Sequence, residues 1–235
     1  NPDGSAFDGH AGGLTVFGDM VYVAGSENCC LYGFEKKELL SAENNSNVTY
    51  CEIVSLSSEK DLIGVAFTTT HNDMLYAGEF YRLPAYPTLD SHIVSCCDGE
   101  NHAIMVGLKK QGNTFVPSVA YSLPGNVQGL SFANGKIYVS TSWGVGFSHI
   151  YCYDESKLVQ QGTINLIGKE LPLFVLDSNS LCQTYKTPPM SEEIEYVDSE
   201  IKYDPLYPIA GNRFGDLFHF VFEKYVNSKG KMTCH

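Results

Sequence analysis

One short pattern occurs four times in this chain and limits the folds that are open to it. In each copy, a run of alternating apolar residues leads through a polar turn into a second short run, which usually has Tyr at its centre. The copies are Leu14–Val23, Val65–Ala77, Leu130–Val139 and Ile194–Tyr203. A period of two indicates a β-strand, and turns such as Asn134-Gly135 favour a two-residue hairpin loop. The pattern therefore predicts four β-hairpins.

Further strand-like runs follow each hairpin, among them Cys30–Phe34, Phe115–Ala120 and His149–Tyr153. A unit of four antiparallel strands that recurs along a chain is typical of the blades of a β-propeller. We therefore expect an all-β fold with one propeller domain over residues 1–235. The expected blades span residues 10–57, 61–124, 126–187 and 190–224. The copies lie further apart than a usual blade, so we expect insertions at residues 82–98 and 158–189.

The hairpin pattern, Gly-[Leu/Val]-x-[Phe/Val] followed by [Leu/Ile/Val]-Tyr-[Val/Ala], resembles the inner hairpins of secreted propellers of the NHL, YVTN and gluconolactonase-like type. The resemblance covers the four hairpins and implies an architecture. In gluconolactonase-like propellers, a divalent cation in the channel polarises a lactone or ester. This chain departs from the resemblance in its blade count, because four blades are recognisable and the last is short. Residues 1–9, blades removed from a precursor or a partner chain would then complete the ring, since an open edge invites aggregation.

Composition narrows the range of partners and compartments. A net charge of −12 argues against nucleic acid, because phosphate binding needs a cluster of Lys and Arg. No run of 18 apolar residues is present, so we expect no membrane span. The Asn44 and Asn47 sequons predict glycosylation. The chain begins at Asn1-Pro2 without a signal peptide or Met, so we expect a mature or processed form of a secreted or luminal protein.

The cysteines agree with an oxidising compartment. There are eight, and none has zinc-like spacing, so an even count favours disulfides. We expect Cys29 or Cys30 to pair with Cys51, Cys152 with Cys182, and Cys234 with Cys96 or Cys97. A bond from one of them to a partner chain is an open alternative.

Polar residues that flank the inner hairpins are the candidates for a site, because the inner strands of a propeller converge on its channel. Carboxylates there would suit calcium, and the candidate metal ligands are Asp8, Asp61, Glu79, Glu192 and Glu193. The candidate ligand-binding residues are His10, Glu79, Tyr81, Gln128 and Trp143. Trp143 lies between glycines in a connecting loop, which is a common way to present a flat apolar surface. Phe80-Tyr81-Arg82 is a second such candidate.

Three functions follow from this sequence. The first is a secreted, disulfide-stabilised glycoprotein that binds a small molecule, glycan or protein at the mouth of the channel. The second is a hydrolase or lactonase that depends on a divalent cation, with carboxylates from several blades around the ion. The third is a structural or matrix protein whose blades serve as an assembly surface. No nucleophile–base pair is evident, because the chain lacks a G-x-S-x-G motif.

Overall fold

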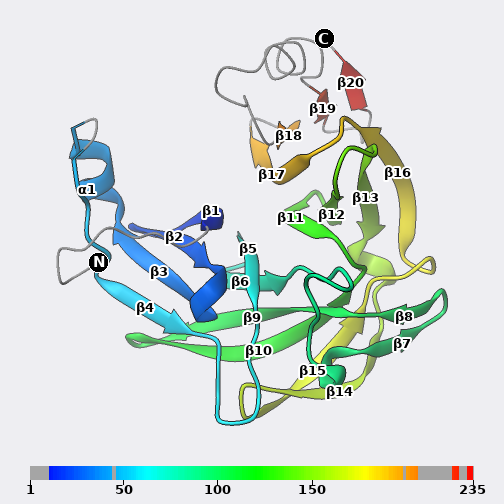
Figure 1. The fold of residues 1–235 in the computed structure, drawn as a ribbon, viewed down its shortest axis with the longest axis horizontal. Coiled ribbons are helices and arrows are strands. Elements are labelled where there is room, and N and C mark those ends of the chain that lie inside the picture. The colour runs from blue at the N-terminus through cyan, green and yellow to red at the C-terminus, as the bar shows by residue number, and fades with distance from the viewer. Residues whose placement is uncertain (1–10, 44–45, 198–199, 206–223, 228–231, 235) are drawn as a thin grey trace.

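The chain folds into sheets, as the sequence predicts. The computed structural model describes residues 11–43, 46–197, 200–205, 224–227 and 232–234, with only the backbone described beyond residue 196. Four sheets of four or more strands and one two-stranded ladder make up this part of the chain. They lie around a common centre (Figure 1). The α-helix α1 (Lys36–Ser41) is a single short turn of chain outside the first sheet.

Three of the sheets are four-stranded and antiparallel. The first contains β1 (Ala11–Phe17), β2 (Met20–Gly25), β3 (Cys30–Glu35) and β4 (Glu52–Ser55). The third contains β11 (Val127–Ala133), β12 (Lys136–Thr141), β13 (Ser148–Asp154) and β16 (Leu181–Thr187). The fourth contains β17 (Ser191–Val197), β18 (Glu200–Pro205), β19 (Lys224–Asn227) and β20 (Met232–Cys234). In the first and fourth sheets, strands that neighbour in sequence also pair, whereas in the third sheet β13 pairs with β16.

The second sheet is larger and mixed. Its order is β14 (Gln160–Leu166), β15 (Lys169–Val175), β10 (Thr114–Leu123), β9 (Ala103–Gln111), β6 (Met74–Glu79) and β5 (Val65–His71). The hairpin β14–β15 comes from the chain between β13 and β16, yet β15 pairs in parallel with β10. The sequence predicts an insertion in the third blade here, and the structure shows that this insertion extends the second sheet.

The four predicted hairpins are confirmed as β1–β2, β5–β6, β11–β12 and β17–β18. In β11–β12, Ala133 pairs with Lys136, and the turn residues Asn134 and Gly135 have φ of 52° and 70°. Positive φ at both positions is what a type I′ turn requires. The Asn72 and Asp73 turn of β5–β6 is built the same way, with φ of 47° and 56°. The turn residues 198–199 of the last hairpin lie outside the described residues.

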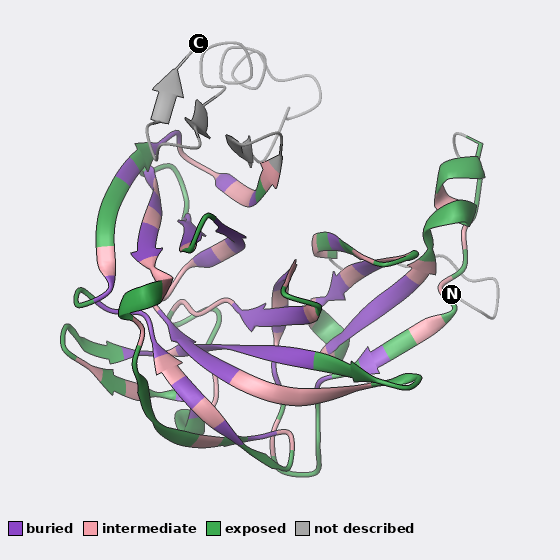
Figure 2. Ribbon diagram, turned by 180° about the vertical axis from the view of Figure 1, so that it is seen from behind, coloured by how far each residue is buried: buried purple, intermediate pink, exposed green. Residues whose placement is uncertain are grey.

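The core lies between successive sheets. The inner strand β5 packs beside β1 and β11, and β11 packs beside β17. One buried cluster fills the space between the first two sheets, a second lies between the second and third, and a third lies between the third and fourth. The mid-strand residues Tyr22, Tyr76 and Tyr138 belong to one cluster each and are buried. Figure 2 shows burial along the inner strands β5 and β11 and exposure at the peripheral turns.

The arrangement is propeller-like, but a closed ring of four blades is not what the described residues show. No core cluster joins the first and fourth sheets within that part of the chain. Strand pairing does not link them either in the described strands. Residues 1–9, which we expected as a closing strand, lie outside the described residues. The described residues therefore form an all-β fold with several antiparallel sheets around one centre.

Three further elements belong to the connections. The loop between β6 and β9 carries the 3-10 helix η2 (Asp90–His92) and the ladder of β7 (Val94–Cys96) and β8 (Gly99–Asn101). Short 3-10 helices η1 (Ser26–Asn28) and η3 (Glu155–Lys157) follow β2 and β13. Among the described helices, none has the length and apolar character needed to cross a bilayer.

Candidate functional site

The predicted site residues that the structure describes lie at one end of the sheets. The pairs Val65↔Glu79 and Val127↔Thr141 show that each inner strand begins where the next strand ends. The inner strands run side by side in the same direction, since Gly12 of β1 adjoins Ala66 of β5 and Thr70 of β5 donates a hydrogen bond to the Val16 carbonyl. We call this end, where the inner strands begin, the mouth end.

Each inner hairpin has an irregular register at the mouth end. The shift falls between Ala11 and Leu14, Val65 and Phe67, Val127 and Gly129, and Ser191 and Ile194. A β-bulge leaves one residue unpaired and re-aims its side chain. Of the predicted residues, Gln128, Glu192 and Glu193 occupy these irregular positions.

Glu193 joins the first and fourth sheets at the centre. Its carboxylate oxygens lie 3.3 and 3.2 Å from the Leu14 nitrogen, which donates to them. The backbones of β11 and β17 also lie close together near Glu193, because a Cβ added at Gly129 of β11 would lie 2.7 Å from Glu193 Cα. Glycine at this position therefore permits β11 and β17 to touch.

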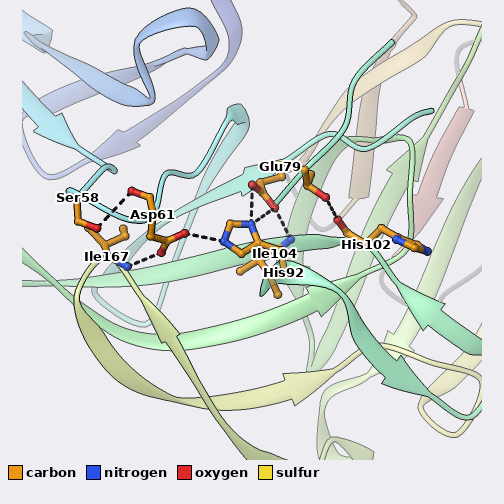
Figure 3. Close-up of polar contacts among 8 residues, drawn as sticks. Ser58, Asp61, Glu79, His92, His102, Ile104 and Ile167 are labelled. Atoms are coloured by element: carbon orange, nitrogen blue, oxygen red, sulfur yellow. Dashed lines mark hydrogen bonds and ion pairs between the residues drawn. The ribbon is translucent and has the colours of Figure 1, made fainter. Parts of the chain in front are cut away.

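A buried His92 cluster holds two of the predicted metal ligands (Figure 3). His92 Nδ1 lies 3.0 Å from both Glu79 carboxylate oxygens, and its Nε2 lies 2.9 Å from Asp61 Oδ1. The second oxygen of Asp61 accepts the Ile167 N–H at 2.7 Å, and Glu79 Oε2 accepts the Ile104 N–H at 3.0 Å. The His92 and Glu79 side chains are 0% and 1% exposed, and that of Asp61 is 13% exposed.

The geometry suits a protonated His92. Ionised carboxylates only accept hydrogen bonds, and a neutral imidazole has one N–H, so two carboxylate partners call for an imidazolium. Burial lowers the pKa of His92, but hydrogen bonds and charge from Glu79, and then from Asp61, outweigh burial and raise that pKa above its usual value. The cluster is a buried ion network that ties five chain segments together.

Glu79 and Asp61 both contact His92 rather than an open channel. The sequence predicts both as ligands at the channel mouth, whereas the structure turns the Glu79 carboxylate onto His92 and away from solvent. Within the described residues, no group of three or more His, Cys, Asp or Glu side chains has an arrangement that could hold a metal ion. Asp8 and His10 lie outside the described residues. Sequence reasoning missed His92, because a single histidine in a long insertion gives no pattern.

A surface cavity lies at the mouth end, between the second and third sheets. Its volume is about 270 Å³, and it is lined by Tyr81, Arg82, Leu83, His102, Gly125 and Asn126. The Asn126 N–H donates to the Tyr81 carbonyl at 3.0 Å, and the Ser142 N–H donates to the Asn126 carbonyl at 3.0 Å. These bonds fix loops of two sheets against each other. The Tyr81 ring stacks on His102, with centroids 4.5 Å apart and 8° between planes.

Two lining residues have unmet hydrogen-bonding capacity. His102 Nδ1 and Asn126 Oδ1 are buried and have no hydrogen-bond partner among the described residues. A buried polar atom without a hydrogen-bond partner lowers the stability of the folded state by about 1–3 kcal/mol. Native structures therefore contain few such atoms. Both residues were outside the sequence prediction, which names Tyr81 from this cavity.

Beside the cavity is an aromatic ledge, formed by Phe80, Tyr86 and Trp143. The Trp143 ring centroid lies 5.9 Å from that of Phe80 and 5.7 Å from that of Tyr86. The Arg82 guanidinium carbon lies 5.5 Å from the Trp143 centroid, within cation–π range. Trp143 is 44% exposed and Tyr86 is 51% exposed. The two aromatic candidates of the sequence, Trp143 and Phe80-Tyr81-Arg82, therefore form one surface.

Reciprocal backbone bonds hold the ledge in place. The Arg82 N–H donates to the Tyr86 carbonyl at 2.9 Å, and the Tyr86 N–H donates to the Arg82 carbonyl at 2.6 Å. They close a small loop that contains a cis peptide bond at Leu83-Pro84. Trp143 reaches the ledge from the third sheet, where the Ser148 hydroxyl donates to the Ser142 hydroxyl at 2.8 Å. The ledge is thus carried by ordered backbone from two sheets.

The remaining predicted sites are modifications. Asn47 is exposed, as glycosylation requires, and Asn44 lies outside the described residues. The seven cysteines whose side chains are described, Cys29, Cys30, Cys51, Cys96, Cys97, Cys152 and Cys182, are free thiols. The side chain of Cys234 is not among those described. Disulfide pairing therefore stays a prediction.

These sheets and their mouth-end loops define an all-β protein with a propeller-like arrangement. No protein-family model matches the chain, and no curated protein sequence matches it. Among solved structures, it is similar to glutaminyl cyclase from Myxococcus xanthus, at 11% identity and a TM-score of 0.42, over 81% of this chain and 66% of that chain.

Two other solved structures have a comparable likeness. For hydrazine synthase from Kuenenia stuttgartiensis, the identity is 7% and the TM-score 0.43, over 94% of this chain and 53% of that chain. For BamB from Moraxella catarrhalis, the identity is 9% and the TM-score 0.39, over 98% of this chain and 51% of that chain. The chain thus spans about half the length of these two. Glutaminyl cyclase and BamB have propeller-like folds, but likeness at this level carries no argument about activity.

Proposed function

We propose that this chain is a carbohydrate-binding protein whose site is the aromatic ledge together with the adjoining cavity. One observation carries the proposal: the exposed rings of Tyr86 and Trp143, together with the half-buried ring of Phe80, border a cavity whose walls include residues with unmet hydrogen-bonding capacity. Binding sites for small molecules combine an apolar, aromatic surface with a few convergent polar groups. The ledge and cavity have this composition.

Carbohydrates suit both halves of the site. The C–H face of a pyranose ring is flat and apolar, so it can lie on an exposed aromatic ring, and its hydroxyls both donate and accept hydrogen bonds. Arg82 adds guanidinium donors for hydroxyl oxygens, while Asn126 and His102 add groups at the cavity wall. A cluster of exposed aromatic rings at one place on a soluble domain is itself a sign of a binding surface.

The test is calorimetry with the full chain and a panel of hexasaccharides derived from cellulose, xylan, mannan, laminarin and chitin. Trp143→Ala is expected to weaken binding of the active sugar about tenfold or more, because the platform ring is lost and a tenfold change is about 1.4 kcal/mol. Phe147→Ala is the matched control. Phe147 is an exposed ring of the same loop, but it lies under Lys186 rather than in the ledge. Failure of every sugar to bind at millimolar concentration contradicts the proposal, as does equal weakening by both variants.

We also propose that the protein is a secreted glycoprotein. The exposure of Asn47 within the Asn47-Val48-Thr49 sequon supports this. Expression through a secretory pathway, followed by peptide mapping with and without an endoglycosidase, tests it. We expect a glycan on Asn47, and an unmodified Asn47 in secreted protein would contradict the expectation.

A further inference from the structure

The sulfur atoms of Cys152 and Cys182 lie within 3.4 Å of each other on neighbouring strands. Cys152 is in β13 and Cys182 is in β16. In the register of these strands, Cys152 pairs with Gln183 and Tyr153 pairs with Leu181, so Cys182 is the extra residue of a bulge. The bulge re-aims the Cys182 side chain, and its Sγ also lies 3.0 Å from the Cys152 carbonyl oxygen.

We propose that Cys152 and Cys182 are a modification site, at which oxidation by a small-molecule disulfide joins β13 to β16. The two sulfurs approach across adjacent strands of a sheet that is already formed, so joining them requires a small movement of side chains and no rearrangement of strands. The proposal is independent of the carbohydrate site, which lies on other loops.

The two thiols have different roles in the reaction. Cys152 is 4% exposed, and burial, followed by the contact with Cys182, raises its pKa to about 12. Cys182 is exposed, so it is the thiol that an external oxidant reaches first. With oxidised glutathione, the Cys182 thiolate attacks one sulfur, forms a mixed disulfide and releases one glutathione thiol.

Cys152 completes the exchange. Its thiol loses a proton to water, and the thiolate attacks Cys182 Sγ, so the mixed disulfide breaks and a second glutathione thiol leaves. Each cysteine loses one hydrogen, and one oxidised glutathione is reduced to two thiols. The electrons therefore balance without a metal or cofactor.

The bond would close a loop that contains η3 and the hairpin β14–β15. That hairpin extends the second sheet through β15, and its Ile167 N–H holds Asp61. Oxidation therefore restricts the conformations of the unfolded chain over a segment that contributes to both the second and the third sheet. From the loop-closure effect, we expect the melting temperature to rise by roughly 5–15 °C.

The experiment compares the reduced full chain with the same chain after prolonged incubation with oxidised glutathione. Remaining thiols are blocked with N-ethylmaleimide in denaturant, and peptides are mapped by mass spectrometry. We expect a linked pair of peptides containing Cys152 and Cys182, two hydrogens lighter than the sum of the reduced peptides. Cys182→Ser should abolish both the linked peptide and the rise in melting temperature. Cys51→Ser, which removes an exposed thiol that directly precedes β4, is the matched control and should leave the linked Cys152–Cys182 peptide unchanged.

Two results would overturn the proposal. One is alkylation of both Cys152 and Cys182 in oxidised protein that still melts cooperatively. The other is recovery of Cys152 linked to a different cysteine. Because Cys182 is exposed, its replacement by serine does not disturb the core, so the comparison does not depend on a variant with an altered fold.

Discussion

Removal of the Glu79 carboxylate should show what the buried His92 cluster contributes. In Glu79→Ala, His92 loses the partner of its Nδ1, and the Ile104 N–H loses its acceptor. Both groups are then left without a partner in a site where the Glu79 side chain is 1% exposed. Breaking a buried ion pair from one side costs about 3–5 kcal/mol, which is a large share of the roughly 5–15 kcal/mol of a typical domain.

The effect should depend on pH in a defined direction. The pKa of His92 is raised in the folded protein, so its contribution to stability is full below its unfolded pKa of about 6.5 and fades as pH rises through the folded value. Glu79 is the main source of the increase in the pKa. The wild type should therefore exceed Glu79→Ala in stability by more at about pH 6 than at about pH 9.

Urea unfolding followed by circular dichroism measures this difference. Glu170→Ala serves as the control, because Glu170 is an exposed carboxylate that accepts a hydrogen bond from Thr163 at 2.7 Å, and its loss should change the unfolding free energy by no more than about 0.5 kcal/mol. Glu79→Gln should lose less than Glu79→Ala, since its amide oxygen can still accept the Ile104 N–H. A loss below about 1 kcal/mol for Glu79→Ala, or equal losses at both pH values, would refute the reasoning.

Two further predictions concern packing and charge. Gly12→Ala places a Cβ 2.1 Å from the Ala66 carbonyl oxygen, and by forcing β1 away from β5 it should lower the free energy of unfolding by about 1–3 kcal/mol. In the same urea unfolding assay, Gly64→Ala should be close to neutral, because its added Cβ meets no atom within 4 Å. Lys136, whose Nζ lies 2.6 Å from Asp154 Oδ2, and a hydrogen bond from Ser156 lower the pKa of Asp154 to about 2. Lys136→Met should raise the pKa of Asp154, measured by NMR titration. As the solution is acidified, the contribution of Asp154 to stability should then be lost at a higher pH than in the wild type. An unchanged pKa would show that Lys136 does not cause the shift.

Local chemistry carried most of the fold prediction. The turn residues Asn134 and Gly135 accept positive φ, and the alternation on either side sets the register, so each inner hairpin can be found from about ten residues of sequence. The pairing of β14–β15 with the second sheet could not be predicted from local sequence. Its pairing with β10 joins segments from two repeats, and nothing within either segment specifies its partner.

The site was foreseen in part for the same reason. Trp143 and Tyr81 were predicted because an aromatic residue in a loop after a strand is visible in the sequence, and they do lie at one surface. His102 and Asn126 were missed, since their place at the cavity depends on the approach of two sheets. Glu79 was predicted at the mouth end, but its carboxylate faces His92, and that orientation depends on how the insertion after β6 folds back.

The parallel pairing of β15 with β10 has a consequence for the order in which the chain can fold. During synthesis, β5 to β10 are complete well before β15 emerges, so the outer edge of β10 has no partner strand for that interval. An unpaired edge of this kind can capture a strand from another chain. The second sheet is therefore exposed to misassembly until β15 has been made, which is after β11, β12 and β13 of the third sheet. Truncation between residues 124 and 168 should yield fragments that aggregate rather than a smaller stable protein.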